Sequence, residues 1–137
     1  MSETAALDTN ILARYLLDDI PDQTSRVKRL FHSAAQGDIQ LFVPASVFVE
    51  LAHLLHRRRS VPRPRVAAAL LGIMRLQGLD IPDRNAIAAA LDFWQSTGGL
   101  SFVDCYHLAL TKELGMTQIY TFDKKMDRFP GVERIEP

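Results

Sequence analysis

Short apolar segments alternate with helical patterns along the chain, and this alternation restricts the fold more than any other feature. Strands are predicted at residues 4–8, 41–43, 79–81, 118–122 and 132–135. Helices are predicted at residues 11–17, 23–36, 44–59, 66–76, 83–94 and 101–115, with a helical turn at 123–129. Strands that alternate with helices indicate an α/β fold, in which right-handed crossovers join the strands of a mainly parallel sheet.

Length and composition predict one globular domain over residues 1–137. A chain of 137 residues can bury roughly two-thirds of its unfolded surface without disulfides or metals. The 16 basic and 16 acidic residues balance, so net charge favours no class of partner. Cys105 is the single cysteine, which excludes an internal disulfide and a cysteine-based metal site. The N-terminus has no basic signal-peptide region and no apolar run is long enough to span a membrane, so we expect a cytoplasmic protein.

Four carboxylates occupy the junctions between these predicted elements. Asp8 follows the first strand and Asp123 follows the strand at 118–122. Glu50 lies among apolar residues of the helix at 44–59, and Asp104 lies in the first turn of the helix that begins at Ser101. Ligands of open parallel sheets bind outside the carboxyl ends of the strands, so we expect the four side chains to converge in one crevice.

Converging carboxylates indicate a divalent cation. Their mutual repulsion would cost several kcal/mol even at moderate effective dielectric, and a bound cation removes that cost. Oxygen ligands without a nearby Cys or His pair favour Mg²⁺ or Mn²⁺ over zinc. Such a site suits hydrolysis of phosphodiester bonds, because the metal activates water and stabilises the leaving oxygen.

Each acid also has a simpler explanation. Asp8 could cap the following helix, as Ser, Thr, Asn and Asp do at this position. Glu50 could reach solvent, Asp104 could complement the helix dipole after Ser101, and Asp123 could cap the last helical turn. Asp127, four residues later, could be a solvated surface charge.

The four motifs resemble those of PIN-domain nucleases. The matching segments are Leu7-Asp8-Thr9-Asn10, Val49-Glu50, Ser101-Phe102-Val103-Asp104-Cys105 and Thr121-Phe122-Asp123. Their order and spacing are most similar to the small VapC-type toxins of prokaryotic toxin–antitoxin pairs. The resemblance extends from the first predicted strand to Val132.

This resemblance implies a Mg²⁺- or Mn²⁺-dependent endoribonuclease with a PIN-like α/β/α fold and a five-stranded, mainly parallel sheet. Asp8, Glu50, Asp104 and Asp123 would be its metal-binding and catalytic residues, with Thr9, Asn10 and Thr121 in supporting positions. The resemblance leaves open whether Asp123 or Asp127 completes the site. It also implies a homodimer and a cognate antitoxin that crosses the active-site groove.

Two local basic clusters could bind RNA. Residues 56–65 contain five arginines, among them Arg57, Arg58 and Arg59, and Lys124 and Lys125 follow Asp123. Arginine matches phosphate oxygens and gives salt-dependent affinity, although arginines at a helix end also complement the helix dipole.

Two other functions fit parts of the sequence. A non-catalytic PIN-like module would bind RNA or a protein through the arginines, and would have no use for four mutually repelling acids. A phosphotransferase with Asp8 as its nucleophile would require a second aspartate two residues later, where the chain has Asn10.

Overall fold

The computed structural model describes residues 3–137 and contains the predicted alternation of strands and helices. The strands are β1 (Glu3–Ala6), β2 (Ile39–Phe42), β3 (Leu79–Asp80), β4 (Gln118–Tyr120) and β5 (Glu133–Ile135). The α-helices are α1 (Thr9–Leu17), α2 (Pro21–Ala35), α3 (Ala45–His53), α4 (Arg63–Met74), α5 (Arg84–Ser96) and α6 (Phe102–Glu113). A π-helical segment, η1 (Leu54–Arg58), continues α3, and a 3-10 turn, η2 (Lys124–Arg128), precedes β5.

Local chemistry sets several of these boundaries. Helix α2 begins with Pro21, whose missing N–H is harmless in the first turn. Helix α6 begins with a capping box: the Asp104 N–H donates to Ser101 Oγ (3.2 Å), and the Ser101 N–H donates to the Asp104 carboxylate (3.4 Å). The predicted helix start at Ser101 is therefore confirmed.

All strand pairs are parallel, which confirms the predicted α/β class. Strands β1, β2 and β3 form one sheet, with Ala5 opposite Leu41 and Leu41 opposite Leu79. Strands β4 and β5 form a separate pair, with Ile119 opposite Arg134. The five predicted strands are thus present over residues 3–137, but they are divided between a sheet of three and a pair.

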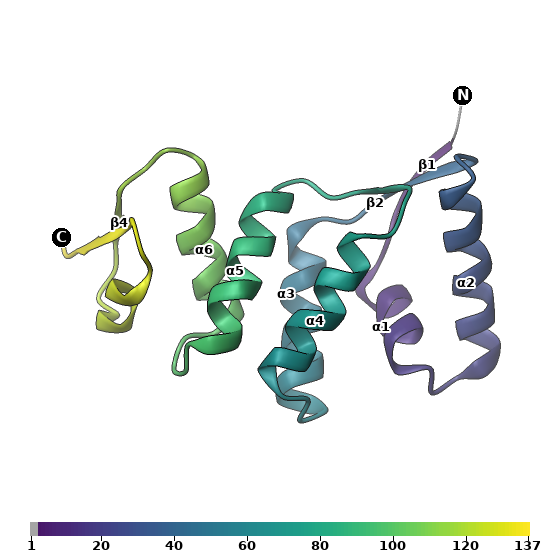
Figure 1. Cartoon of the computed structure of the whole chain (residues 1–137), viewed down its shortest axis with the longest axis horizontal. Helices are drawn as coiled ribbons and strands as arrows, with labels where there is room; N and C mark the ends of the chain where they lie inside the picture. Colours follow the sequence, from purple (N-terminus) through teal and green to yellow (C-terminus); the bar gives the residue numbers. More distant parts are fainter. Residues whose placement is uncertain (1–2) are drawn as a thin grey trace.

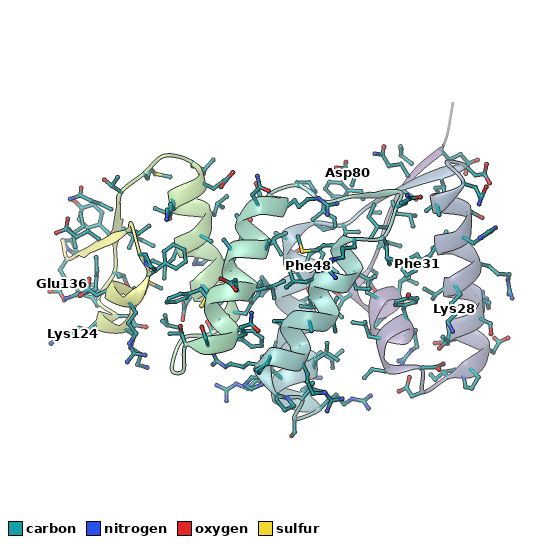
Figure 2. All side chains as sticks on the ribbon, in the orientation of Figure 1. Lys28, Phe31, Phe48, Asp80, Lys124 and Glu136 are labelled. Atoms are coloured by element: carbon teal, nitrogen blue, oxygen red, sulfur yellow. The ribbon has the colours of Figure 1, made fainter. Side chains whose placement is uncertain are left out.

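The two sheets lie at opposite ends of an elongated molecule (Figure 1). Strands β1 and β2 lie beside α2 at the N-terminal end, and helices α3 to α6 separate them from β4 and β5. Figure 2 shows Lys28 near one end and Lys124 and Glu136 at the other, with Phe48 in the middle. Among the helices of residues 3–137, none has the length and apolar character needed to cross a membrane.

The core is continuous through the central helices. Fully buried side chains include Phe48 and Leu51 of α3, Leu70 of α4 and Leu91 of α5. Trp94 is 2% exposed and packs edge-on against Phe102, which joins α5 to the start of α6. These contacts fix the position of the N-terminus of α6 relative to α3.

Candidate active-site cleft

A cleft of about 520 Å³ opens between the start of α1, the face of α3 and η1, and the N-terminus of α6. Polar, basic and aromatic side chains surround it. The lining residues are Asp8, Thr9, Asn10, Val49, Glu50, Ala52, His53, Leu54, His56, Arg57, Arg58, Arg63, Trp94, Ser101, Phe102 and Val103. Several residues predicted from the sequence therefore share this cleft. They are the acids Asp8 and Glu50, the supporting residues Thr9 and Asn10, and the predicted RNA-binding residues Arg57 and Arg58.

Asp8 sits where β1 gives way to α1, with extended backbone angles. It occupies the N-cap position of α1, but its side chain makes no capping hydrogen bond. The explanation of Asp8 as a helix cap therefore does not account for its carboxylate, which remains available to a ligand in the cleft.

Thr9 follows Asp8 in the chain and forms a hydrogen bond with Glu50. Its side chain is nearly buried, with 8% of the residue exposed, and its hydroxyl donates a 2.6 Å hydrogen bond to Glu50 Oε2. This contact ties the first turn of α1 to α3 across 41 residues of sequence. It anchors the Glu50 carboxylate at the first turn of α1, the helix whose N-cap is Asp8.

Asp104 lies beside the cleft but is not among its lining residues. The three residues before it, Ser101, Phe102 and Val103, line the cleft, while the Asp104 carboxylate closes the capping box of α6. In this structure Asp104 therefore serves its own helix, as the simpler explanation of this residue predicted.

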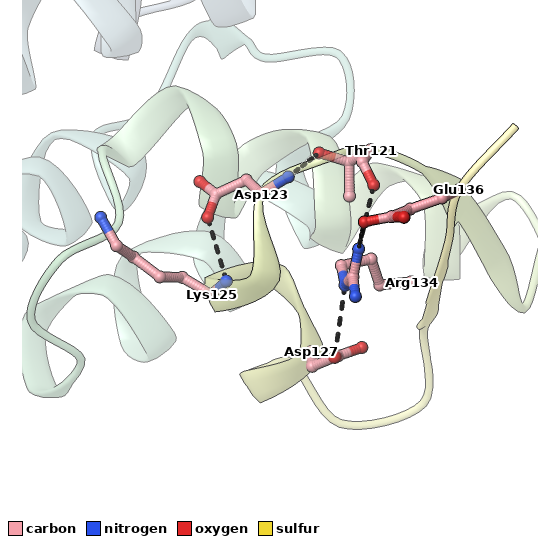
Figure 3. Close-up of polar contacts among 6 residues, drawn as sticks. All are labelled: Thr121, Asp123, Lys125, Asp127, Arg134 and Glu136. Atoms are coloured by element: carbon pink, nitrogen blue, oxygen red, sulfur yellow. Dashed lines mark hydrogen bonds and ion pairs between the residues drawn. The ribbon is translucent and has the colours of Figure 1, made fainter.

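Asp123 caps the η2 turn near β4 and β5 (Figure 3). Its carboxylate accepts a hydrogen bond from the Lys125 N–H (3.0 Å), and its own N–H donates to Thr121 Oγ1 (3.1 Å). The local explanation of Asp123 as a cap is thus confirmed, whereas the supporting role in an acidic site that the resemblance implies for Thr121 stays a prediction.

Asp127 is held in a separate network. Arg134 lies 3.3 Å from Asp127 and 2.7 Å from Glu136, and it also donates to the Thr121 carbonyl oxygen (Figure 3). The hydrogen bond with Glu136, and secondarily that with Asp127, raises the pKa of Arg134. The Asp127 carboxylate therefore forms an ion pair with Arg134 within the C-terminal unit.

The four predicted acids do not converge in this arrangement. Asp8 and Glu50 line one cleft, Asp104 caps α6, and Asp123 lies in the unit of β4, η2 and β5. Within residues 3–137 no three or more His, Cys, Asp or Glu side chains are grouped so that they could hold a metal ion. The donors have the oxygen chemistry of a Mg²⁺ or Mn²⁺ site. Because Mg²⁺ is usually held by one or two carboxylates together with waters and substrate phosphates, Asp8 and Glu50 fit part of such a site.

The basic wall of the cleft includes a residue that sequence analysis did not single out. Arg63 lies over the Trp94 ring, 4.9 Å from its centroid, and donates to the carbonyl oxygens of Trp94 (3.1 Å) and Thr97 (2.8 Å). It was visible only as one of five clustered arginines, because its packing on Trp94 depends on a contact between helices distant in sequence.

The other predicted basic residues lie outside the cleft lining. Arg59 approaches Asp19 at 3.5 Å, and Lys125 Nζ donates to the Gly99 carbonyl oxygen (3.3 Å). Lys124 is exposed on η2. Of the residues predicted to bind RNA, two therefore line the cleft, Arg57 and Arg58. The other three lie outside its lining: Arg59, Lys124 and Lys125.

Comparisons with known proteins connect the chain to one family. The PIN domain family matches residues 5–132. Two relatives, "VapC ribonuclease Mb1869c" of Mycobacterium bovis and "Ribonuclease VapC13" of Mycobacterium tuberculosis, are each 27% identical over 131 residues, covering 94% of this chain and 97% of the relative. The family match spans nearly the whole chain, including the Asp8–Thr9–Glu50 cleft and the segment of Asp123, and the chain therefore belongs to the PIN-domain family.

Proposed function

We propose that this protein is an endoribonuclease of the VapC type, the toxin of a toxin–antitoxin pair, and that RNA is cut in the Asp8–Glu50 cleft. The observation that carries the proposal is that two carboxylates and three arginines, Arg57, Arg58 and Arg63, line the same cleft. The relatives named as VapC ribonucleases support it, since their similarity covers almost all of both chains.

The arginines would bind the RNA backbone. Guanidinium groups match phosphate oxygens, and their affinity falls as salt concentration rises. Arg63 is already held by two carbonyl oxygens and by Trp94, so it offers a fixed positive charge, whereas Arg57 and Arg58 are exposed. A phosphate placed between these side chains would lie in the cleft that Asp8 and Glu50 also line.

The two carboxylates would act on water. An ionised carboxylate within hydrogen-bond reach of a water molecule accepts its proton as the water attacks phosphorus. The Thr9 hydroxyl occupies one oxygen of Glu50 and fixes that side chain, while Asp8 makes no cap bond. Thr9 is accordingly a positioning residue in this proposal.

Dependence on Mg²⁺ or Mn²⁺ is part of the proposal. Asp8, Glu50, Asp104 and Asp123 would hold the ion once all four meet, and an oxygen-only donor set supports a hard cation. Asp8 and Glu50 line the cleft as described, so the four-carboxylate site requires in addition that Asp104 and Asp123 approach it.

The test is cleavage of purified small RNA with Mg²⁺, Mn²⁺ or EDTA, by the wild-type protein and by Asp8→Asn and Glu50→Gln variants. We expect discrete fragments that require the metal and are lost in both variants. Asp38→Asn is the matched control, because Asp38 is an exposed turn residue outside the cleft. Equal activity of wild type and both variants would contradict the proposed site.

A second candidate function is a non-catalytic RNA-binding module, favoured by the observation that the four acids do not converge. It predicts RNA binding that survives Asp8→Asn but weakens in an Arg57→Gln/Arg58→Gln variant. Arg26→Gln/Arg29→Gln removes the same charge from exposed positions on α2 and is its control. Binding without any metal-dependent cleavage would favour this function over the nuclease.

A toxin of this type would also bind an antitoxin. Co-expression with the product of a neighbouring small gene should then suppress both RNA cleavage and growth arrest. Growth arrest that requires Asp8 and Glu50 would support the toxin assignment independently of the cleavage assay.

A further inference from the structure

Strand β1 presents an unusually open surface for a strand of a parallel sheet. It pairs with β2 on one side, and within residues 3–137 its other edge pairs with no strand. All four of its residues are exposed, although Thr4, Ala5 and Ala6 are small or apolar, and Phe42 of β2 is 38% exposed. Parallel sheets are normally covered on both faces, and open edges attract further strands.

Strand β4 presents a matching surface at the other end of the molecule. It pairs with β5 on one side, and its other edge has no strand beside it in the described chain. Large apolar side chains around it are exposed: Leu114 at 64%, Met116 at 50%, Tyr120 at 70% and Phe122 at 72%. Most other large apolar residues of the protein are buried or half-buried, so the exposed ones are concentrated near this strand.

The total surface agrees with an uncovered interface. The accessible surface is 7910 Å², whereas a folded monomer of 15.4 kDa typically has about 7,200 Å². The excess is what a chain would expose if part of its normal packing surface were supplied by another molecule.

The two open edges of one chain do not meet. Helices α3 to α6 lie between β1 and β4 along the length of the molecule (Figure 1). The β4–β5 unit is also anchored where it is, because Phe129 packs on Phe93 of α5 and Arg128 donates to the Gly98 carbonyl oxygen (2.7 Å). A second copy can bring its β4 to β1 without breaking these contacts.

We propose that two copies of this chain exchange their C-terminal strands: β4 of each copy adds in parallel to the open edge of β1 of the other. The arrangement is reciprocal, so one two-fold axis closes it and leaves no repeating open surface. Each half then has one five-stranded parallel sheet, ordered β3, β2, β1 and the partner's β4 and β5. Strand β3 has an open edge too, but its two residues offer a much shorter pairing surface.

This exchange would add Asp123 to the acidic site, and that part of the inference rests on the proposed nuclease function. Asp8 follows β1 and Asp123 follows β4, so parallel pairing of these strands places both acids at the same end of the combined sheet. The cleft that holds Asp8 and Glu50 would receive Asp123 from the other copy. The dimer would then bring three of the four motif acids together, with Asp104 beside the cleft at the start of α6.

Cysteine cross-linking tests the contact without any reference to activity. If Asp8 and Asp123 are level, Ala5 lies opposite Tyr120, and neighbouring strands place such residues about 4.8 Å apart, within disulfide range. Ala5→Cys and Tyr120→Cys are made in separately tagged copies that both carry Cys105→Ala, and the two copies are co-expressed. The native thiol is buried, which raises the pKa of Cys105 to about 12 and leaves it unreactive, but its removal avoids ambiguity.

We expect a covalent dimer that carries both tags on a non-reducing gel. Glu133→Cys on β5 replaces Tyr120→Cys in the control, because β5 would be two strands away from β1 and should not cross-link. Placing Ala5→Cys and Tyr120→Cys in one chain distinguishes the alternatives: a disulfide-bonded monomer would show closure within the chain and overturn the proposal. A wild-type protein that sediments as a monomer at every concentration would overturn it as well.

Complementation between inactive copies tests the shared site. In a mixed dimer of an Asp8→Asn copy with an Asp123→Asn copy, one site carries both substitutions and the other carries neither. Random pairing should therefore restore about a quarter of the wild-type cleavage rate, whereas each variant alone is inactive. No recovery despite formation of the cross-linked dimer would refute the shared site; failure of wild-type cleavage would instead refute the nuclease function and leave the strand exchange standing.

Discussion

Thr9 is the residue through which the cleft fixes one of its two carboxylates. Its hydroxyl donates to Glu50 at 2.6 Å, while most of the residue is buried between α1 and α3. Its neighbours Asp8 and Asn10 face the cleft directly. A threonine in this position couples the packing of two helices to the direction of an acid that we propose to be catalytic.

The substitution Thr9→Val tests this role, because valine keeps the shape and removes the donor. We expect the rate of RNA cleavage to fall about tenfold, as for other residues that orient a catalytic group. The free energy of unfolding should change by only about 1 kcal/mol, the usual worth of one hydrogen bond. Thr9→Ser should restore the rate, and a Thr9→Val protein with full activity would show that Glu50 needs no such orientation.

At the residue scale, the sequence predicted the N-terminal half of the cleft well. Asp8, Glu50 and Thr9 belong to short motifs that follow a strand or lie on one helix, and the structure brings them together. Arg63 was not singled out, because its place depends on Trp94, 31 residues away. Asp104 illustrates the opposite case, since its local capping pattern alone explains where its carboxylate lies.

The close approach of the end of α2 to the start of β3 depends on a single glycine. Gly78 has a positive φ of 84° immediately before β3, and a Cβ at this position would collide with the Ala34 carbonyl at the end of α2. Its own carbonyl oxygen accepts a hydrogen bond from the Leu41 N–H of β2 (2.8 Å). The glycine therefore lets a helix end, a turn and the central strand approach one another.

We expect Gly78→Ala to lower the free energy of unfolding by about 3 kcal/mol, from backbone strain together with the clash. Gly37→Ala is the matched control, because Gly37 has nearly the same φ of 83° and no atom within 4 Å of a Cβ added there. That variant should lose only about 1 kcal/mol, from the left-handed backbone alone. Urea unfolding of both proteins measures the difference, and equal losses would show that the approach to Ala34 is unimportant.

Helices α5 and α6 are joined by the hydroxyl of Tyr106, which donates to Asp83 Oδ2 (2.9 Å) at the start of α5. Burial, and then the hydrogen bond to Asp83, raises the pKa of Tyr106 to about 12. An unfolded tyrosine loses its proton near pH 10. Between these two values the folded protein binds more protons than the unfolded chain, so stability falls as pH rises.

Tyr106→Phe should remove this part of the pH dependence. The wild-type protein should exceed the variant in stability by a constant amount below about pH 10, and the advantage should shrink as pH approaches the folded pKa of about 12. Denaturant unfolding across this range measures it, with Tyr15→Phe as the control for loss of one phenol. A difference that is independent of pH would contradict the raised pKa.

At the scale of elements, periodicity located nearly every helix and strand but not their exact extent. The helix predicted at 44–59 is divided into α3 and the π-helical η1, and Arg57 and Arg58 of η1 line the cleft. The strand predicted at 118–122 ends at Tyr120, because Thr121 and Asp123 begin the hydrogen-bonded turn into η2. Such changes follow from tertiary packing and side-chain hydrogen bonds, which the periodicity of a sequence does not indicate.

At the scale of the whole molecule, the sequence predicted the number and direction of the strands but not which chain supplies them. Alternating strands and helices indicate a parallel sheet whether β4 comes from the same chain or from a second copy. Ala5 and Ala6 of β1 and the side chains of Tyr120 and Phe122 are exposed although they are apolar, as residues of interior strands would be. The apolar residues of these strands thus indicate that both strands are covered in the functional protein. The unpaired edges of β1 and β4 indicate that each is covered by the other strand, from a second copy.

Metal binding and dimerisation should consequently be linked. If Asp8 and Glu50 of one copy and Asp123 of the other share an ion, then Mg²⁺ or Mn²⁺ binds the dimer and hardly binds the monomer. By mass action, saturating metal should strengthen dimerisation by about tenfold or more. Sedimentation across protein concentrations, with and without metal, measures this shift without any cleavage assay.

The same experiment separates Asp123 from Asp127. Asp123→Asn should dimerise with an affinity that no longer responds to metal, because the exchanged strand would bring an amide in place of a carboxylate. Asp127→Asn should keep the full response, since Asp127 pairs with Arg134 and serves the fold of the β4–β5 unit. A wild-type dimer whose affinity ignores metal would mean that strand exchange, if it occurs, does not build the acidic site. A metal response lost in Asp127→Asn and kept in Asp123→Asn would exchange the roles assigned to these two acids.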